Sequence, residues 1–267
     1  MLRDRTCVWL GAMEYSRFLD CLAADHDRLR ALVETHADAP VPTCPGWTVA
    51  DLTRHVGEVY LHKAAAMRDG AEPEPWPPKE FADEAPTALL DRGYTALRAE
   101  FATRAPEDPA GSWYGPDQSV GFWIRRMAQE TVVHRIDAEL ATGRPVSAVP
   151  DDLAVDGVDE LLKVFAAYSV AEWGDYFTEI LDGSPGRTFL VRAGDDAAWR
   201  VRTGPGEFTV TDGAGDGTAD VTLSGPPEGV LRSLWNRAGD GGDDGVSVEG
   251  APEAVAELRR CLVEATQ

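Results

Sequence analysis

Hydrophobic residues recur at helical spacing through the first half of the chain. The apolar stripe of residues 16–34 consists of Leu19, Leu22, Leu29 and Leu32. Aspartate and arginine side chains occupy the opposite face of that segment, as on a helix with one buried side. Three later segments have the same period. The pattern therefore predicts four helices, at residues 16–34, 49–67, 86–103 and 120–142.

Local signals mark the ends of these helices. Thr48 and Asp51 have the spacing of a capping box at the start of the second helix. Four prolines within residues 70–78 predict an irregular loop behind that helix. Gly143 and Pro145 end the fourth helix. Four helices joined by irregular loops predict a four-helix bundle.

The pattern changes after Pro150. Residues 151–176 are still helical in period, but short runs of alternating polarity follow, each bounded by Gly, Pro or Asp. These runs predict strands at residues 188–192, 199–203, 207–211, 219–224 and 246–249. Two further helices are predicted at residues 226–236 and 252–265. This order of elements predicts an α+β domain, with helices packed on an antiparallel sheet. We therefore expect two domains, at residues 1–148 and 149–267.

Composition limits the classes of molecule that the chain is expected to bind. The chain has 267 residues with 25 Lys+Arg against 46 Asp+Glu, which gives a formal net charge of −21. Such a charge repels phosphate backbones, so neither nucleic acid nor an anionic membrane is an expected partner. No apolar run is long enough to cross a bilayer, and the four cysteines are widely scattered. We expect a cytoplasmic protein.

Histidine and carboxylate side chains on the bundle helices are the candidate functional residues. The sequence holds no Walker loop, G-x-G-x-x-G fingerprint, G-x-S-x-G elbow or H-E-x-x-H motif. Glu130 and His134 are one helical turn apart, so one cation can reach both. His55 shares a face of its helix with apolar neighbours and is expected to point into the bundle. Two imidazoles and one carboxylate leave an open coordination position, as in catalytic zinc sites.

Other interpretations remain open at this stage. Glu58 and His62 repeat the spacing of Glu130 and His134, and a salt-bridged histidine without a metal fits either pair. Asp137 either orients His134 from outside the metal shell or pairs with an arginine such as Arg135. His26, between two aspartates, is expected on the solvated surface.

Two motifs frame the candidate ligands. Residues 42–55 read Pro-Thr-Cys-Pro-Gly-Trp-Thr-Val-Ala-Asp-Leu-Thr-Arg-His, and residues 130–139 read Glu-Thr-Val-Val-His-Arg-Ile-Asp-Ala-Glu. Together they resemble the mycothiol-dependent maleylpyruvate isomerase family. The resemblance implies a DinB-like metal-binding four-helix bundle followed by a smaller α+β domain similar to sterol carrier proteins. It also implies that His55, Glu130 and His134 ligate a divalent metal, expected to be zinc, and that His62 does not.

Such a centre suits thiol chemistry. A free thiol has a pKa near ~8.5 and is largely protonated at neutral pH, whereas zinc with an open position binds it as the nucleophilic thiolate. The resemblance therefore implies a metal-dependent isomerase or S-transferase with mycothiol as the thiol cosubstrate and an electrophilic or unsaturated small molecule as substrate. We expect a monomer or small homo-oligomer. The alternatives are a non-catalytic small-molecule binding protein and a thiol-independent metal hydrolase that uses the same three residues.

Overall fold

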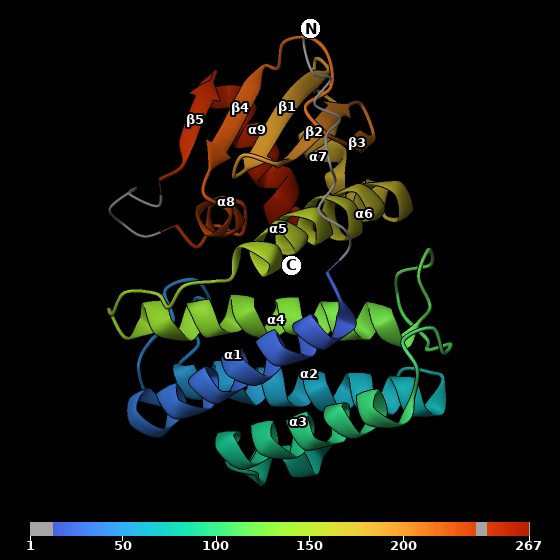
Figure 1. Ribbon diagram of the computed structural model, residues 1–267, viewed down its shortest axis with the longest axis vertical. Helices are drawn as coiled ribbons and strands as arrows, with labels where there is room; N and C mark the ends of the chain where they lie inside the picture. Colours follow the sequence, from blue (N-terminus) through green and yellow to red (C-terminus); the bar gives the residue numbers. More distant parts are fainter. Residues whose placement is uncertain (1–12, 239–244, 267) are drawn as a thin grey trace, which may run out of the picture. The chain divides into compact units, whose positions relative to one another are not determined.

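The structure is a computed structural model that describes residues 13–238 and 245–266. The described residues divide into two compact units: residues 14–147 form one, and residues 148–238 and 245–266 together with Met13 form the other. Figure 1 draws the helices and strands of both units. Residues 1–12 of the predicted first domain lie outside the described residues.

The first unit contains four long helices that run alongside one another (Figure 1). They are α1 (Tyr15–His36), α2 (Val49–Asp69), α3 (Pro86–Thr103) and α4 (Val120–Ala141). A short 3₁₀ helix, η1 (Lys79–Asp83), interrupts the connection between α2 and α3. The predicted four-helix region is confirmed, and the four helices begin and end within two residues of the predicted positions.

Local side-chain chemistry explains these boundaries. The Thr48 side chain accepts from the backbone N–H of Asp51, and the Asp51 carboxylate accepts from the backbone N–H of Thr48, so the predicted capping box is present. Gly70 ends α2 in the left-handed conformation, at φ 70°. Ser119 caps the start of α4 by accepting from the backbone N–H of Phe122.

Helices α2 and α3 approach each other through two glycines. A Cβ at Gly93 would lie 2.5 Å from the carbonyl oxygen of Gly57, and a Cβ at Gly57 would lie 2.8 Å from the backbone nitrogen of Leu90. No side chain fits between the two backbones at this crossing. The position of α2, which carries His55, is therefore fixed on its α3 side by backbone contact.

The second unit begins with a helical segment that differs from the prediction. The prediction was one helix over residues 151–176. The chain instead forms α5 (Asp151–Glu160), a π-helical segment η2 (Leu161–Ala167), α6 (Tyr168–Glu172), a 3₁₀ turn η3 (Gly174–Phe177) and α7 (Thr178–Leu181). The seven-residue π segment spans fewer than two turns, which is too short for its longer period to show in the apolar pattern.

Five strands form one sheet in the order β3-β2-β1-β4-β5. The strands are β1 (Arg187–Ala193), β2 (Ala197–Gly204), β3 (Glu207–Asp212), β4 (Val221–Gly225) and β5 (Ser247–Gly250). Each corresponds to a predicted strand, so the predicted α+β class is confirmed.

The prediction of a wholly antiparallel sheet is wrong, because β1 and β4 pair in parallel. The connection between β3 and β4, residues 213–220, is not a hairpin: it returns the chain to the far side of β1. Arg200 of β2 fixes this connection by donating to the carbonyl oxygens of Ala214 and Gly217. Strand periodicity gives no information about such a crossover, because it shows which face is buried and not which strands are neighbours.

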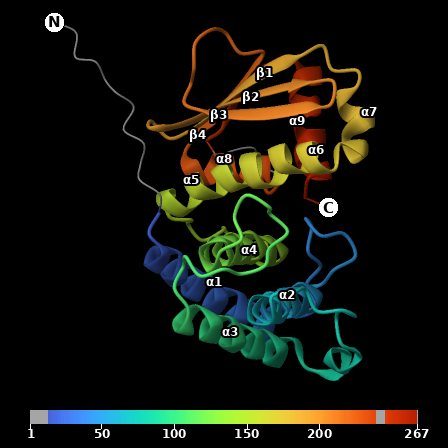
Figure 2. The same ribbon diagram turned by 90° about the vertical axis from the view of Figure 1, so that its right-hand side faces the viewer.

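One face of the sheet carries the core of the second unit. Alternate residues of β1, β2 and β3 are buried there: Phe189, Val191, Trp199, Val201 and Phe208. Helices α5, α6 and α8 (Pro227–Leu234) lie on the same side of the sheet (Figure 2). Helix α9 (Pro252–Glu264) completes the unit. None of the helices in the described part of the chain has the length and hydropathy that a bilayer crossing requires.

His26 on α1 is buried, and the prediction of a solvated position is wrong. Its ring stacks on Tyr94 of α3 with centroids 3.8 Å apart. His26 is four residues after Leu22 and three before Leu29, so helical spacing places it within the buried stripe despite its acidic neighbours. Burial lowers the pKa of His26, although Asp27 opposes this shift.

This burial predicts a pH dependence of stability. Because the pKa of His26 is lower in the folded chain than its ordinary value near ~6.5, the unfolded chain binds a proton that the folded chain does not. The contribution of His26 to the free energy of unfolding is present above about pH 6.5 and is lost as the pH falls below it. We expect His26→Gln to flatten the decline in stability between pH 7.5 and 5.5, measured by urea unfolding. His36→Gln, at the end of the same helix, should keep the wild-type decline; parallel curves for wild type and His26→Gln would disprove the assignment.

Candidate metal centre

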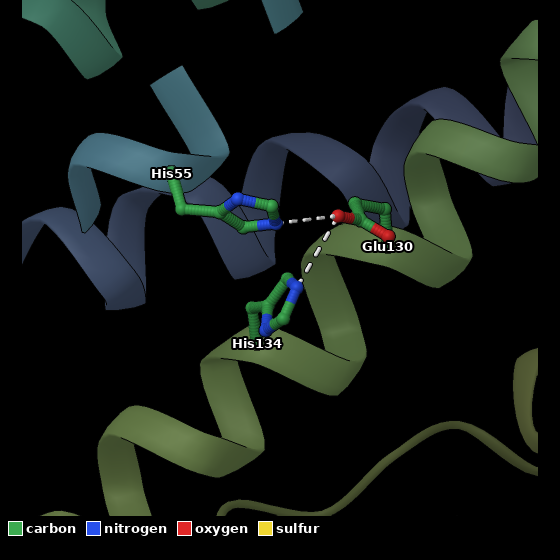
Figure 3. A group of neighbouring side chains, drawn as sticks. All are labelled: His55, Glu130 and His134. Carbon is green, nitrogen blue, oxygen red and sulfur yellow. Dashed lines mark ion pairs between the residues drawn. The ribbon is translucent and has the colours of Figure 1, made fainter. Parts of the chain in front are cut away.

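Helices α2 and α4 bring together the three residues predicted as metal ligands. His55 comes from α2, and Glu130 and His134 come from adjacent turns of α4 (Figure 3). His55 Nε2 lies 3.5 Å from Glu130 Oε1, and His134 Nε2 lies 3.2 Å from the same oxygen. The three possible ligand atoms lie within 4.8 Å of one another, and no other such cluster of His, Cys, Asp or Glu occurs among the described residues.

These separations fit a small divalent metal. Zinc–nitrogen and zinc–oxygen bonds of about 2.0–2.2 Å in a tetrahedron place ligand atoms roughly 3.3–3.5 Å apart. The two nitrogen–oxygen separations are close to that range. The side chains of His55, Glu130 and His134 are 36%, 18% and 13% exposed, so the cluster is sheltered but reachable from solvent. That they hold a metal stays a prediction.

A buried aspartate orients His134. His134 Nδ1 lies 3.0 Å from Asp137 Oδ2, so a protonated Nδ1 donates to this carboxylate and Nε2 is left to face Glu130. Asp137 is fully buried. The alternative pairing of Asp137 with Arg135 does not occur; Arg135 donates to Asp25 instead.

The turn before α2 holds that aspartate in place. Thr43 Oγ1 donates to Asp137 Oδ1 over 2.5 Å, and Cys44 Sγ lies 3.8 Å from Asp137 Oδ2. Trp47, in the same turn, lies against His55 with ring centroids 5.1 Å apart. The turn therefore contacts both histidines of the cluster, one directly and the other through Asp137.

Arg126 holds the other oxygen of Glu130. Its Nη2 donates to Glu130 Oε2 over 2.7 Å, which leaves Oε1 for the two histidines. Burial works to raise the pKa of Glu130, but His134, His55 and Arg126 together hold it well below its usual range. Arg126 is not among the residues predicted from the sequence, although its position four residues before Glu130 places it on the same face of α4.

The electrostatics of His134 affect any metal that binds. Burial works to lower the pKa of His134, but Glu130 and Asp137 raise it to about 9. The imidazolium must lose its proton before Nε2 can serve as a ligand, so a metal competes with that proton at neutral pH.

His62, which shared the spacing of His134 in the sequence, lies elsewhere. Its ring packs edge-on against Trp76 in the connection between α2 and α3, with centroids 5.0 Å apart. The structure thus separates two histidines that the Glu-x-x-x-His pattern could not separate.

The fold and this cluster define a two-domain protein in which a helical bundle carries a candidate His/Glu/His metal centre. Residues 19–139 match the mycothiol maleylpyruvate isomerase N-terminal domain, and residues 152–257 match the C-terminal domain of the same family. The chain therefore belongs to the mycothiol-dependent maleylpyruvate isomerase family.

Solved structures support the shared fold. Crystal structures of a mycothiol-dependent maleylpyruvate isomerase and of a histidine-to-alanine mutant of that isomerase each match with a TM-score of 0.57 and 14% sequence identity. Each match covers 90% of this chain and 96% of that chain. A UbiJ-SCP2 ubiquinone synthesis protein also matches over 45% of this chain and 97% of its own, at 17% identity, but its TM-score of 0.28 establishes no shared fold. A comparison with curated protein sequences finds no significant match.

The ligand set is tested by metal content. We expect the wild-type chain to bind zinc stoichiometrically and His55→Ala and His134→Ala to lose it, because each variant removes one of the three predicted ligands. His62→Ala removes a histidine from the same helix as His55 but outside the cluster, and should retain zinc. Elemental analysis of the three purified variants is the measurement. Full zinc occupancy in either ligand variant would show that the assignment is wrong.

A second prediction follows from the contact between Thr43 and Asp137. We expect Asp137→Ala to weaken zinc binding by about 10–100-fold, since residues that orient a metal ligand typically contribute that much. Thr43→Val should cause a smaller loss, and Thr43→Ser, which keeps the hydroxyl, should restore wild-type affinity. Competition with a chromogenic chelator measures these affinities. Equal affinities for wild type and Asp137→Ala would exclude a role for this contact in metal binding.

Proposed function

We propose that this chain is a metal- and mycothiol-dependent enzyme of the cytoplasm that adds a thiol to an electrophilic or unsaturated small molecule. The observation that carries the proposal is the convergence of His55, Glu130 and His134 within 4.8 Å, at the two motifs that resemble the family. Membership of the family supports the choice of mycothiol as the thiol, because the matching N-terminal domain is named after a mycothiol maleylpyruvate isomerase.

The three residues would hold the metal, and zinc suits two imidazoles and a carboxylate with an open position. When bound, the metal supplies a Lewis acid that lowers the pKa of a coordinated thiol, so the nucleophile is available at neutral pH. Asp137 keeps Nε2 of His134 directed at the site, and Arg126 keeps Oε1 of Glu130 there. These residues thus preorganise the ligands before the substrate arrives.

Two outcomes are consistent with this chemistry. In an isomerase, the thiol adds to a conjugated double bond, rotation occurs about the new single bond, and the thiol leaves. In an S-transferase, the adduct is the product. The ligands are the same in both cases, and the groups that position the electrophile determine which outcome follows.

Turnover experiments test the proposal. We expect the zinc-loaded protein to isomerise maleylpyruvate, or to form the thioether adduct of maleate, only when mycothiol is added. Activity should disappear after treatment with a chelator and return with added zinc. His134→Ala should be inactive under the same conditions, because it removes a ligand, whereas His62→Ala should keep wild-type activity. Absorbance assays follow both reactions.

Contrary results would point to the rival functions. Turnover that depends on zinc but not on thiol would favour a metal hydrolase with the same three residues. Protein without bound metal, purified together with an organic ligand, would favour a non-catalytic small-molecule binding protein.

A further inference from the structure

A half-buried lysine lies near the candidate metal centre on the facing surfaces of α2 and α4. Lys63 is eight residues after His55, about 12 Å along the axis of α2 at the usual helical rise. Its ammonium lies 5.0 Å from the ring centroid of Trp123, which is seven residues before Glu130 on α4. The surfaces on which α2 and α4 face each other therefore hold two groups: the candidate metal centre, and about two turns further along α2 the pair Lys63 and Trp123.

The contacts of Lys63 do not offset the free-energy cost of burying its charge. The side chain is only 17% exposed, and Nζ lies 3.4 Å from Glu72 Oε1. Glu72 is more than half exposed, in the connection between α2 and α3, so solvent screens this ion pair and it contributes little. Burial accordingly lowers the pKa of Lys63, against the opposing effects of Glu72 and Glu130. A structural ion pair alone is therefore a poor account of a lysine at this position.

The aromatic surface below Lys63 is rigid. Trp123 is fully buried, and its indole N–H donates to the carbonyl oxygen of Gly111 over 2.9 Å. A cation above such a ring is stabilised without losing its N–H donors to the ring, so the ammonium can still donate hydrogen bonds to a ligand.

The charges around Glu130 favour an anion at this position. Arg126 is paired with Glu130, and Lys63 lies within electrostatic range of both residues. A divalent metal on Glu130 would share that carboxylate with Arg126 and leave an excess of positive charge between the helices. This would be a local cationic region in a chain whose formal net charge is −21.

We propose that Lys63, held above Trp123, binds a carboxylate group of the electrophilic substrate while the reacting carbon lies toward the metal centre. This inference rests on the proposed function for the identity of the electrophile. It assigns Lys63 the role of anchoring and orienting the substrate through a carboxylate.

Three lysines in the whole sequence make a direct test possible. Zinc-loaded full-length protein, labelled at its lysine side chains, gives separate NMR signals for Lys63, Lys79 and Lys163. We expect succinate to shift the Lys63 signal saturably and to leave the other two unchanged. Succinamide, which has the same length and no charge, should shift none of the three.

A matched variant gives the second measurement. Lys63→Met should weaken succinate binding by about tenfold in calorimetry, and Lys79→Met should leave it unchanged. Zinc content and circular dichroism of the same samples show whether each variant is folded. If Lys63→Met does not fold, the titration of the wild-type signals decides the question alone.

Two results would overturn the inference: equal movement of all three lysine signals, or unchanged succinate affinity in a folded Lys63→Met variant. The proposed function fails separately. Protein that binds no zinc contradicts the metal-dependent enzyme, whereas zinc-bearing protein whose Lys63 signal does not respond to succinate contradicts only the anion site.

Discussion

The hydrogen bond between His134 and Asp137 is the interaction on which the candidate centre depends. It fixes the imidazole with Nε2 toward Glu130, and it requires a carboxylate in a position that excludes water. A carboxylate there is stable only because several donors surround it, and Thr43 is one of them. The turn before α2 and the middle of α4, which are about ninety residues apart, are thus joined by one acidic side chain. The two sequence motifs of the family meet at that side chain.

The sequence predicted the features that depend on neighbours in the chain. Helix α2 begins where Thr48 and Asp51 cap it, and α4 places Glu130 and His134 one turn apart because both lie on one helix. Features that depend on distant segments could not be predicted in this way. The parallel pairing of β1 with β4 follows from a crossover, and the position of His55, rather than His62, beside Glu130 follows from how α2 packs against α4. Sequence spacing shows which residues share one face of a helix or strand. Only the fold shows which other residues that face contacts.

Charge has two different roles in this chain. Most of the 46 acidic residues contribute only to the net charge of −21, from which the sequence predicts repulsion of anionic polymers. Glu130 and Asp137 are instead sheltered from solvent and paired, so their contribution comes from orientation. The basic groups that act on Glu130 also come from inside the bundle. In an acidic protein, the local surroundings of a side chain, and not the overall balance of charge, decide which small molecules it attracts.

The contact between Gly57 and Gly93 has a consequence for changing substrate range. Since backbone meets backbone at this crossing, there is no side chain at either glycine that could be trimmed to enlarge a binding site, and a larger residue would push α2 away from α3. Natural variation and laboratory selection must then act on other surfaces. Residues of α4 outside the candidate metal centre, and the connection that carries Glu72, lie away from this glycine contact. Libraries aimed at these positions would sample new specificities while leaving the scaffold that carries His55 intact.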